Sequence, residues 1–270
     1  MIHATALTRD YESLRALDSL DLAVGAGEVL GLVGANGAGK TTCLQCLAGI
    51  MPPTSGQVTI NGVSLRDDPR AAKRWIAFIP DTPQLFEYLT VREHMLLIAR
   101  VYGLRDWEPR AAALLEEFEI AEKADALPNE LSRGMKQKAA ICQAFLPEPR
   151  VILCDEPLSG LDPLGRRSMR EALLARARSG AALIVSSHQL DLVSAMSDRI
   201  LILDRGKHLL EGTLAEIQRA LPSLDGNASL EEVFLAAVSG AGALDPARRA
   251  APASARVDAP PPAAPAEPPE

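Results

Sequence analysis

The segment GANGAGKTT at residues 34–42 constrains this chain more than any other feature. It matches the spacing G-x-x-x-x-G-K-[ST], in which glycines let the backbone turn tightly and bring its N–H groups onto phosphate oxygens. The lysine supplies a positive charge for the outer phosphates, and the hydroxyl that follows suits Mg²⁺. The residues that we expect to contact phosphate are Gly34, Asn36, Gly37, Ala38, Gly39, Lys40, Thr41 and Thr42.

The residues on either side of this loop fit an anion site. Residues 28–33 form a short apolar run typical of a buried strand, and residues 41–49 have the pattern of a helix. A strand, a glycine-rich loop and a helix N-terminus together present backbone amides to an anion. The alternative, a glycine-rich turn that matches by chance, explains neither flank.

A second candidate site follows the apolar run at residues 151–154, which ends in Asp155 and Glu156. A buried strand delivers its last residues to the carboxyl edge of a sheet, where α/β folds bind ligands. Asp155 is suited to holding Mg²⁺, and Glu156 is suited to polarising a water for attack on a phosphate. The alternative is a charged turn, but two adjacent acids leaving a buried strand are costly without a partner such as a metal.

Length and charge narrow the function classes. The chain has 270 residues and a net charge of −7, which disfavours a basic nucleic-acid-binding surface. No apolar run approaches the ~20 residues that span a bilayer, and the first ten residues lack a secretory pattern. We therefore expect a cytoplasmic protein that would reach a membrane only through a partner.

The four cysteines include one C-x-x-C pair, Cys43 and Cys46. Such a pair can indicate zinc or redox chemistry, but no second pair stands at zinc-ligand spacing. The pair also lies on the helix expected after the phosphate loop. We therefore interpret the cysteines as small apolar packing residues in a reducing compartment.

The pattern along the chain predicts an α/β protein. Residues 1–33 alternate like antiparallel strands, and an Asn61-Gly62 turn follows a further strand at 57–60. Other expected strands cover 74–80, 151–154, 182–185, 200–203 and 208–210, and expected helices cover 91–102, 108–119, 132–145 and 165–178. After about residue 240 the chain is rich in Ala and Pro, which predicts a disordered tail over 241–270.

Three further motifs accompany these two sites: one lies between them and two follow the second site. They are LSRGM at 131–135, SGLDP at 159–163 and SSH at 186–188. Together the five motifs resemble the ATP-binding cassette (ABC) family, the ATPase subunits of ABC transporters, over about residues 5–238. The resemblance implies a P-loop NTPase (RecA-like) core at 1–89 and 146–225, with an N-terminal antiparallel β-subdomain. It also implies a helical insert subdomain at 90–145 and a C-terminal helix at 228–238.

The resemblance assigns further site residues. Tyr11 is similar to the family's aromatic that stacks on adenine, for which any flat ring is suitable. Ser132 and Gly134 resemble the signature motif, which binds the γ-phosphate held by the opposite subunit. Asp162 resembles an acid at the dimer interface, and His188 resembles the histidine that contacts the γ-phosphate.

Two departures from the family pattern stand out. The signature usually reads LSGGQ, and here Arg133 and Met135 change it. The family also has a glutamine, which links Mg²⁺ to the transporter interface, where this chain has Asp81. Aspartate is itself an oxygen ligand, and Gln84 could substitute only if the loop shifted. The metal ligands that we expect are Thr41, Asp81 and Asp155.

The resemblance implies an ATP hydrolase that uses Mg²⁺ and works as a homodimer or with a homologous ATPase. Both departures are similar to those of bacterial exporter ATPases with a separate membrane permease. The protein would then lie on the inner face of the cell membrane through that permease and bind no nucleic acid. One alternative is a soluble ATP switch for a non-transport partner, and another is a nucleotide-binding scaffold with little hydrolysis.

Overall fold

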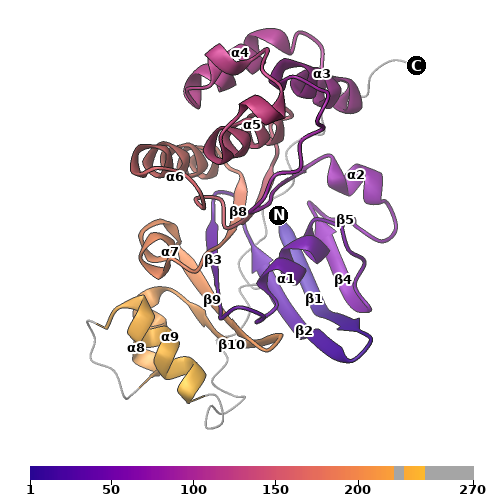
Figure 1. The fold of residues 1–270 in the computed structure, drawn as a ribbon. Helices are drawn as coiled ribbons and strands as arrows, with labels where there is room; N and C mark the ends of the chain where they lie inside the picture. Colours follow the sequence, from indigo (N-terminus) through magenta and orange to yellow (C-terminus); the bar gives the residue numbers. More distant parts are fainter. Residues whose placement is uncertain (222–227, 241–270) are drawn as a thin grey trace.

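The computed structural model describes residues 1–221 and 228–240, so the predicted Ala/Pro-rich tail lies outside the described residues. The strands of this described part form two sheets (Figure 1). The first sheet has the order β2-β1-β4-β5 and pairs antiparallel throughout. Its strands are β1 (Ile2–Tyr11), β2 (Leu14–Val24), β4 (Ser55–Ile60) and β5 (Val63–Ser64). The antiparallel strands expected at the N-terminus are therefore confirmed.

The predicted Asn61-Gly62 turn joins β4 to β5. Both residues have positive φ, 51° and 80°, as a two-residue hairpin turn of type I′ requires. The pairing of Ile60 with Val63 closes the hairpin.

The second sheet has six strands in the order β10-β9-β3-β8-β7-β6. They are β3 (Val29–Val33), β6 (Ile76–Ile79), β7 (Val151–Asp155), β8 (Ala182–Ser186), β9 (Arg199–Asp204) and β10 (Lys207–Gly212). All neighbours are parallel except β9 and β10. The parallel arrangement brings the carboxyl ends of β3, β7 and β8 to one edge, where the loops carrying the predicted site begin.

Helices cover this sheet and extend beyond it (Figure 1). The helices are α1 (Lys40–Leu47), α2 (Pro69–Lys73), α3 (Val91–Tyr102), α4 (Glu108–Glu117), α5 (Arg133–Phe145), α6 (Pro163–Arg178), α7 (Leu190–Met196), α8 (Leu214–Ala220) and α9 (Leu230–Ser239). Helices α3, α4 and α5 gather at one end of the molecule, whereas α8 and α9 lie at the opposite end. In residues 1–221 and 228–240, no helix is both long and apolar enough to cross a bilayer.

Among the described residues, buried apolar side chains form three clusters. One joins α3, α4, α5 and α6 to β7 and β8, so the helical insert shares its core with the sheet. A second lies around α1 and between the two sheets, and the third joins β9 and β10 to α7, α8 and α9. This packing fixes the phosphate loop and the strand ends on one rigid body.

Candidate functional site

The phosphate loop connects β3 to α1, as the sequence predicts. Gly39 is the N-cap of α1 with a φ of 105°, and no side chain caps this helix. The amides of the first turn therefore have no side-chain acceptor and are available to an anion. Asn36 and Gly37 lie exposed beside them.

At two positions of the phosphate loop, the surrounding backbone leaves no room for a side chain. A Cβ atom on Gly34 would lie within 3.0 Å of the Leu203 carbonyl oxygen, and one on Gly39 within 3.0 Å of the Ala16 carbonyl oxygen. The loop therefore passes against β2 and β9 at a distance that only glycine allows.

Lys40 folds back over its own loop. Its Nζ donates hydrogen bonds to the carbonyl oxygens of Gly34 at 2.7 Å and Ala35 at 3.1 Å, and the residue is 9% exposed. Burial lowers the pKa of Lys40, while the nearby charges of Glu156 and Asp155 act to raise it. The phosphate loop and the acidic strand end thus belong to one electrostatic site.

Asp155 is the last residue of β7 and is buried. It pairs in register with Ser186 of β8, and the Ser186 hydroxyl donates to Asp155 Oδ1 at 2.6 Å. The sequence motif included Ser186, but its role in holding Asp155 depends on strand register.

Glu156 has a φ of 50°, a left-handed conformation that is unusual for a side chain of this size. Its carboxylate accepts hydrogen bonds from Ser187 Oγ at 3.0 Å and from the His188 amide at 2.7 Å. The His188 Nδ1 lies 2.9 Å from Glu156 Oε2. The two predicted catalytic residues are therefore in direct contact, at the ends of adjacent strands. Backbone strain of this kind concentrates at functional sites.

The oxygens of Thr41 and Asp155 form a donor set that fits Mg²⁺, which takes one or two protein ligands alongside phosphate oxygens. Thr41 is exposed at the start of α1, and Asp155 keeps Oδ2 free of the Ser186 bond. Asp81 instead faces a cation, because Arg133 Nη2 lies 3.4 Å from Asp81 Oδ1. Gln84 is exposed in the same loop.

Ser132 and Asp162 each cap a helix. The Ser132 hydroxyl accepts from the Met135 amide at 3.2 Å at the start of α5, and Asp162 Oδ1 accepts from the Gly165 amide at 3.0 Å at the start of α6. A Cβ on Gly134 would lie 3.3 Å from the Gly160 carbonyl oxygen, so this glycine also serves close packing. Contact of Ser132, Gly134 and Asp162 with a second subunit stays a prediction.

Tyr11 is the last residue of β1 in the antiparallel sheet. Its hydroxyl donates to Met51 Sδ at 2.8 Å, and the Arg9 guanidinium carbon lies 4.9 Å from the ring centroid. The Arg9 guanidinium therefore lies over the Tyr11 ring. Stacking of adenine on Tyr11 remains a prediction.

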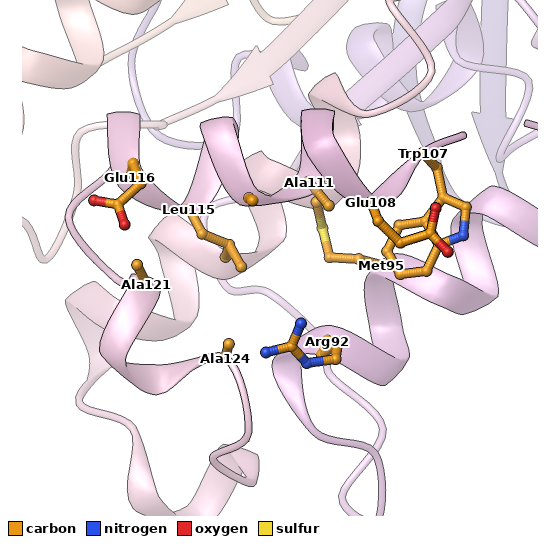
Figure 2. Close-up of a pocket in the computed structure, with 10 residues that line it drawn as sticks. Arg92, Met95, Trp107, Glu108, Ala111, Leu115, Glu116, Ala121 and Ala124 are labelled. Carbon is orange, nitrogen blue, oxygen red and sulfur yellow. The ribbon is translucent and has the colours of Figure 1, made fainter. Parts of the chain in front are cut away.

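A separate cavity of about 190 Å³ lies between α3 and α4 (Figure 2). Met95, Trp107 and Leu115 contribute to its wall, and none of the predicted site residues lines it. This cavity belongs to the helical insert and not to the phosphate site.

Comparison with known proteins decides the family. A family model described as "ABC transporter" matches residues 17–159, and the "ABC-type transporter ATP-binding protein EcsA" of Bacillus subtilis is 35% identical over 85% of this chain and 93% of its own length. The chain belongs to the ABC transporter family. As a member it is an ABC-type ATPase, the ATP-binding and ATP-hydrolysing subunit of a transporter.

Other relatives and solved structures agree. The "Nod factor export ATP-binding protein I" of Mesorhizobium japonicum is 36% identical over 76% of this chain and 61% of its own length. A solved "ATP binding subunit of ABC transporter" superposes with a TM-score of 0.84 at 36% identity, covering 88% of this chain and 99% of the other. A dimeric post-hydrolysis structure of the ATP-binding cassette MJ0796 with ADP and Pi superposes at 0.74 and 26% identity, covering 79% and 99%. These matches confirm the ABC fold of this chain.

Proposed function

We propose that this ABC ATPase powers export through a separate membrane permease, and that two ATPase subunits close on Mg·ATP and reopen after hydrolysis. The observation that carries the hydrolysis step is that Glu156, in contact with His188, also acts on the charge of Lys40. Each comes from a different segment, and each has a role in phosphoryl transfer to water.

In this site the α1 amides and Lys40 hold the phosphates. Glu156 accepts a proton from the attacking water, and the Ser187 hydroxyl and His188 amide fix its carboxylate. His188 would donate a hydrogen bond toward the γ-phosphate, a role supported by its mostly exposed ring beside Glu156. Mg²⁺ held by Thr41 and Asp155 would neutralise charge on the phosphates.

Pairing of two subunits would place the α5 N-terminus of one over the phosphate loop of the other. The exposed Ser132 and the small Gly134 leave that helix end accessible to an anion. The MJ0796 cassette was solved as a dimer with ADP and Pi, which supports pairing of two subunits for this chain.

The proposed permease would dock on an apolar surface formed by Leu85, Phe86, Tyr88, Leu89 and Leu97. Phe86 is 62% exposed and Tyr88 is 89% exposed, which is unusual for large aromatic side chains. Exposed apolar groups gathered at one place favour an interface with another chain. A hydrophobic multi-span protein that co-purifies with this chain would support transport, whereas a purely soluble complex would support the ATP-switch alternative.

The substitution Glu156→Gln tests the catalytic proposal. Glutamine keeps the shape of the side chain but cannot take the proton, so ATP hydrolysis should fall by about 10²–10⁴-fold. Nucleotide binding should survive, and an ATP-dependent dimer should accumulate in size-exclusion chromatography. The matched control is Glu119→Gln, because Glu119 also has a left-handed φ (55°) but lies in the helical insert. Unchanged hydrolysis in the Glu156 variant would remove this residue from the role.

A further inference from the structure

The two departures from the family's sequence pattern meet in space. Arg133, in the signature segment, places Nη2 3.4 Å from Asp81 Oδ1, and the same nitrogen donates to Ser159 Oγ at 3.1 Å. Arg133 is the first residue of α5, Asp81 follows β6, and Ser159 follows β7. We propose that Arg133 is a positioning residue that ties the start of α5 to both strand-end loops, with Asp81 as its charge partner. The link to catalysis rests on the proposed function.

A second contact joins the same two segments. Gln137, one helical turn after Arg133, is 1% exposed, and its Nε2 donates to the Pro80 carbonyl oxygen at 3.2 Å. Residues four apart lie on the same face of a helix. One face of α5 is therefore attached to consecutive residues, Pro80 and Asp81, after β6.

The loop after β7 is shaped around the arginine. Gly160 has a φ of 74°, and a Cβ there would lie 2.8 Å from Arg133 Nε. The Gly160 carbonyl oxygen in turn lies against Gly134. The arginine stem and the glycine pair thus pack together, which fixes where the guanidinium sits.

The charges at the start of α5 explain why Arg133 pairs with Asp81. A cation in the first turn of a helix opposes the helix dipole, so Arg133 gains nothing from α5 itself. Helix α5 has no acidic residue in its first turn, whereas α3, α8 and α9 each carry a glutamate there. Asp81 supplies the missing negative charge from another segment. The first-turn amides of α5 that the Ser132 hydroxyl does not cap then stay available to a phosphate, because Arg133 is bonded to Asp81 and Ser159.

This role differs from a metal role for Asp81. A carboxylate engaged by a guanidinium is neutralised locally and is a weaker partner for Mg²⁺. Both side chains are exposed, at 60% for Arg133 and 45% for Asp81, and exposed pairs add little to stability. We therefore expect the pair to affect the geometry of the α5 start and not the stability of the fold.

A double-mutant cycle in the full chain tests the proposal. The variants are Arg133→Met, which keeps the stem over Gly160, Asp81→Ala, and the two combined. Hydrogen–deuterium exchange reports on the Met135 and Lys136 amides, which both bond to Ser132. Each single variant should speed their exchange by about fivefold, near the upper end for an exposed pair, and the double variant should add nothing. Arg133→Lys should retain most of the protection.

The control cycle uses the exposed pair Arg92 and Asp125, whose atoms lie 2.9 Å apart within the helical insert. Arg92→Met and Asp125→Ala should leave exchange at Met135 and Lys136 unchanged. Additive effects of the Arg133 and Asp81 substitutions, or equal effects from the control pair, would overturn the proposal.

The metal alternative gives a separate signature. Titration of Mg²⁺ against ATP hydrolysis should show no additional shift when Asp81→Ala is added to Arg133→Met. A further rise in the Mg²⁺ requirement would identify Asp81 as a metal ligand and overturn its role as an anchor. A wild-type chain that bound no nucleotide would contradict the proposed function. The double-mutant cycle followed by hydrogen–deuterium exchange would still measure the coupling between Arg133 and Asp81.

Discussion

At the scale of single residues, Gly31 has no space for a side chain. It lies in the centre of β3, and a Cβ there would lie within 3.0 Å of Val193 Cγ1 and Ser197 Oγ on the α7 side. Gly31→Ala should therefore lower the free energy of unfolding by about 1–3 kcal/mol through overpacking, as measured by urea denaturation.

The control for this prediction is Gly25→Ala. A Cβ on Gly25 would lie 3.4 Å from Glu28 Oε2, which is an ordinary contact, and this substitution should have little effect on stability. Equal unfolding free energies for wild type and Gly31→Ala would show that α7 moves away from β3 at little cost.

The same scale shows which site residues a sequence can predict. The phosphate loop and Glu156 follow from local motifs, since each chemistry needs particular residue types at fixed spacing. Local motifs do not predict the hydrogen bond from Ser187 to Glu156 or the ion pair of Arg133 with Asp81. Arg133 and Asp81 are separated by 52 positions, and only the packing of α5 against β6 brings them together.

At the scale of secondary-structure elements, helices α3, α8 and α9 begin with the same acidic cap. Glu93, Glu216 and Glu232 each accept a hydrogen bond from the N-cap residue's own amide, at 2.8 Å or less. These bonds lower the pKa of each glutamate from its ordinary value of 4.5. A lowered pKa means that the folded state binds fewer protons than the unfolded chain, so the caps stabilise fully above about pH 4.5.

We predict that this stabilisation disappears as the pH falls through the lowered values. The triple variant with Gln at Glu93, Glu216 and Glu232 keeps an acceptor that does not titrate. It should be less stable than wild type at pH 6, and the difference should vanish at acidic pH. Urea unfolding at a series of pH values measures this, and a difference that stays constant with pH would contradict it.

Element length explains where sequence patterns fail. The pattern predicts α3 at its observed bounds, because its twelve residues show clear periodicity between a cap and Gly103. Helices α2, α7 and α8 have five, seven and seven residues and are not predicted. Such short segments are not stable as isolated helices, so their conformation is decided by packing, as when α7 packs on β3.

At the scale of the whole molecule, the helical insert is bound to the rest by more than its chain connections. Arg176 of α6 bonds to both carboxylate oxygens of Glu117, at 2.7 and 2.9 Å, and its guanidinium lies 3.9 Å from the Phe145 ring centroid. The insert also shares one apolar cluster with β7 and β8. We therefore expect the insert and the sheet to unfold together.

The cysteines allow this cooperativity to be measured, because they divide between two cores. Cys43 and Cys46 lie in the cluster around α1, and Cys142 and Cys154 lie in the cluster shared with the insert. All four are buried and free. Burial raises the pKa of Cys46 to about 11 and raises the pKa of the other three thiols as well, so the reactive thiolate is scarce in the folded state.

A thiol reagent at pH 8 should therefore label the folded chain slowly, and all four cysteines should react at one rate set by global unfolding. Bound Mg·ADP at about 100 times its Kd stabilises the folded state by about 2.7 kcal/mol and should slow every cysteine by about 100-fold. Mass spectrometry of quenched samples resolves the individual sites. If Cys142 were labelled faster than Cys43, or were not slowed by nucleotide, the insert would open without the sheet. A common rate would show that the helical insert and the core around the phosphate loop unfold as one cooperative unit.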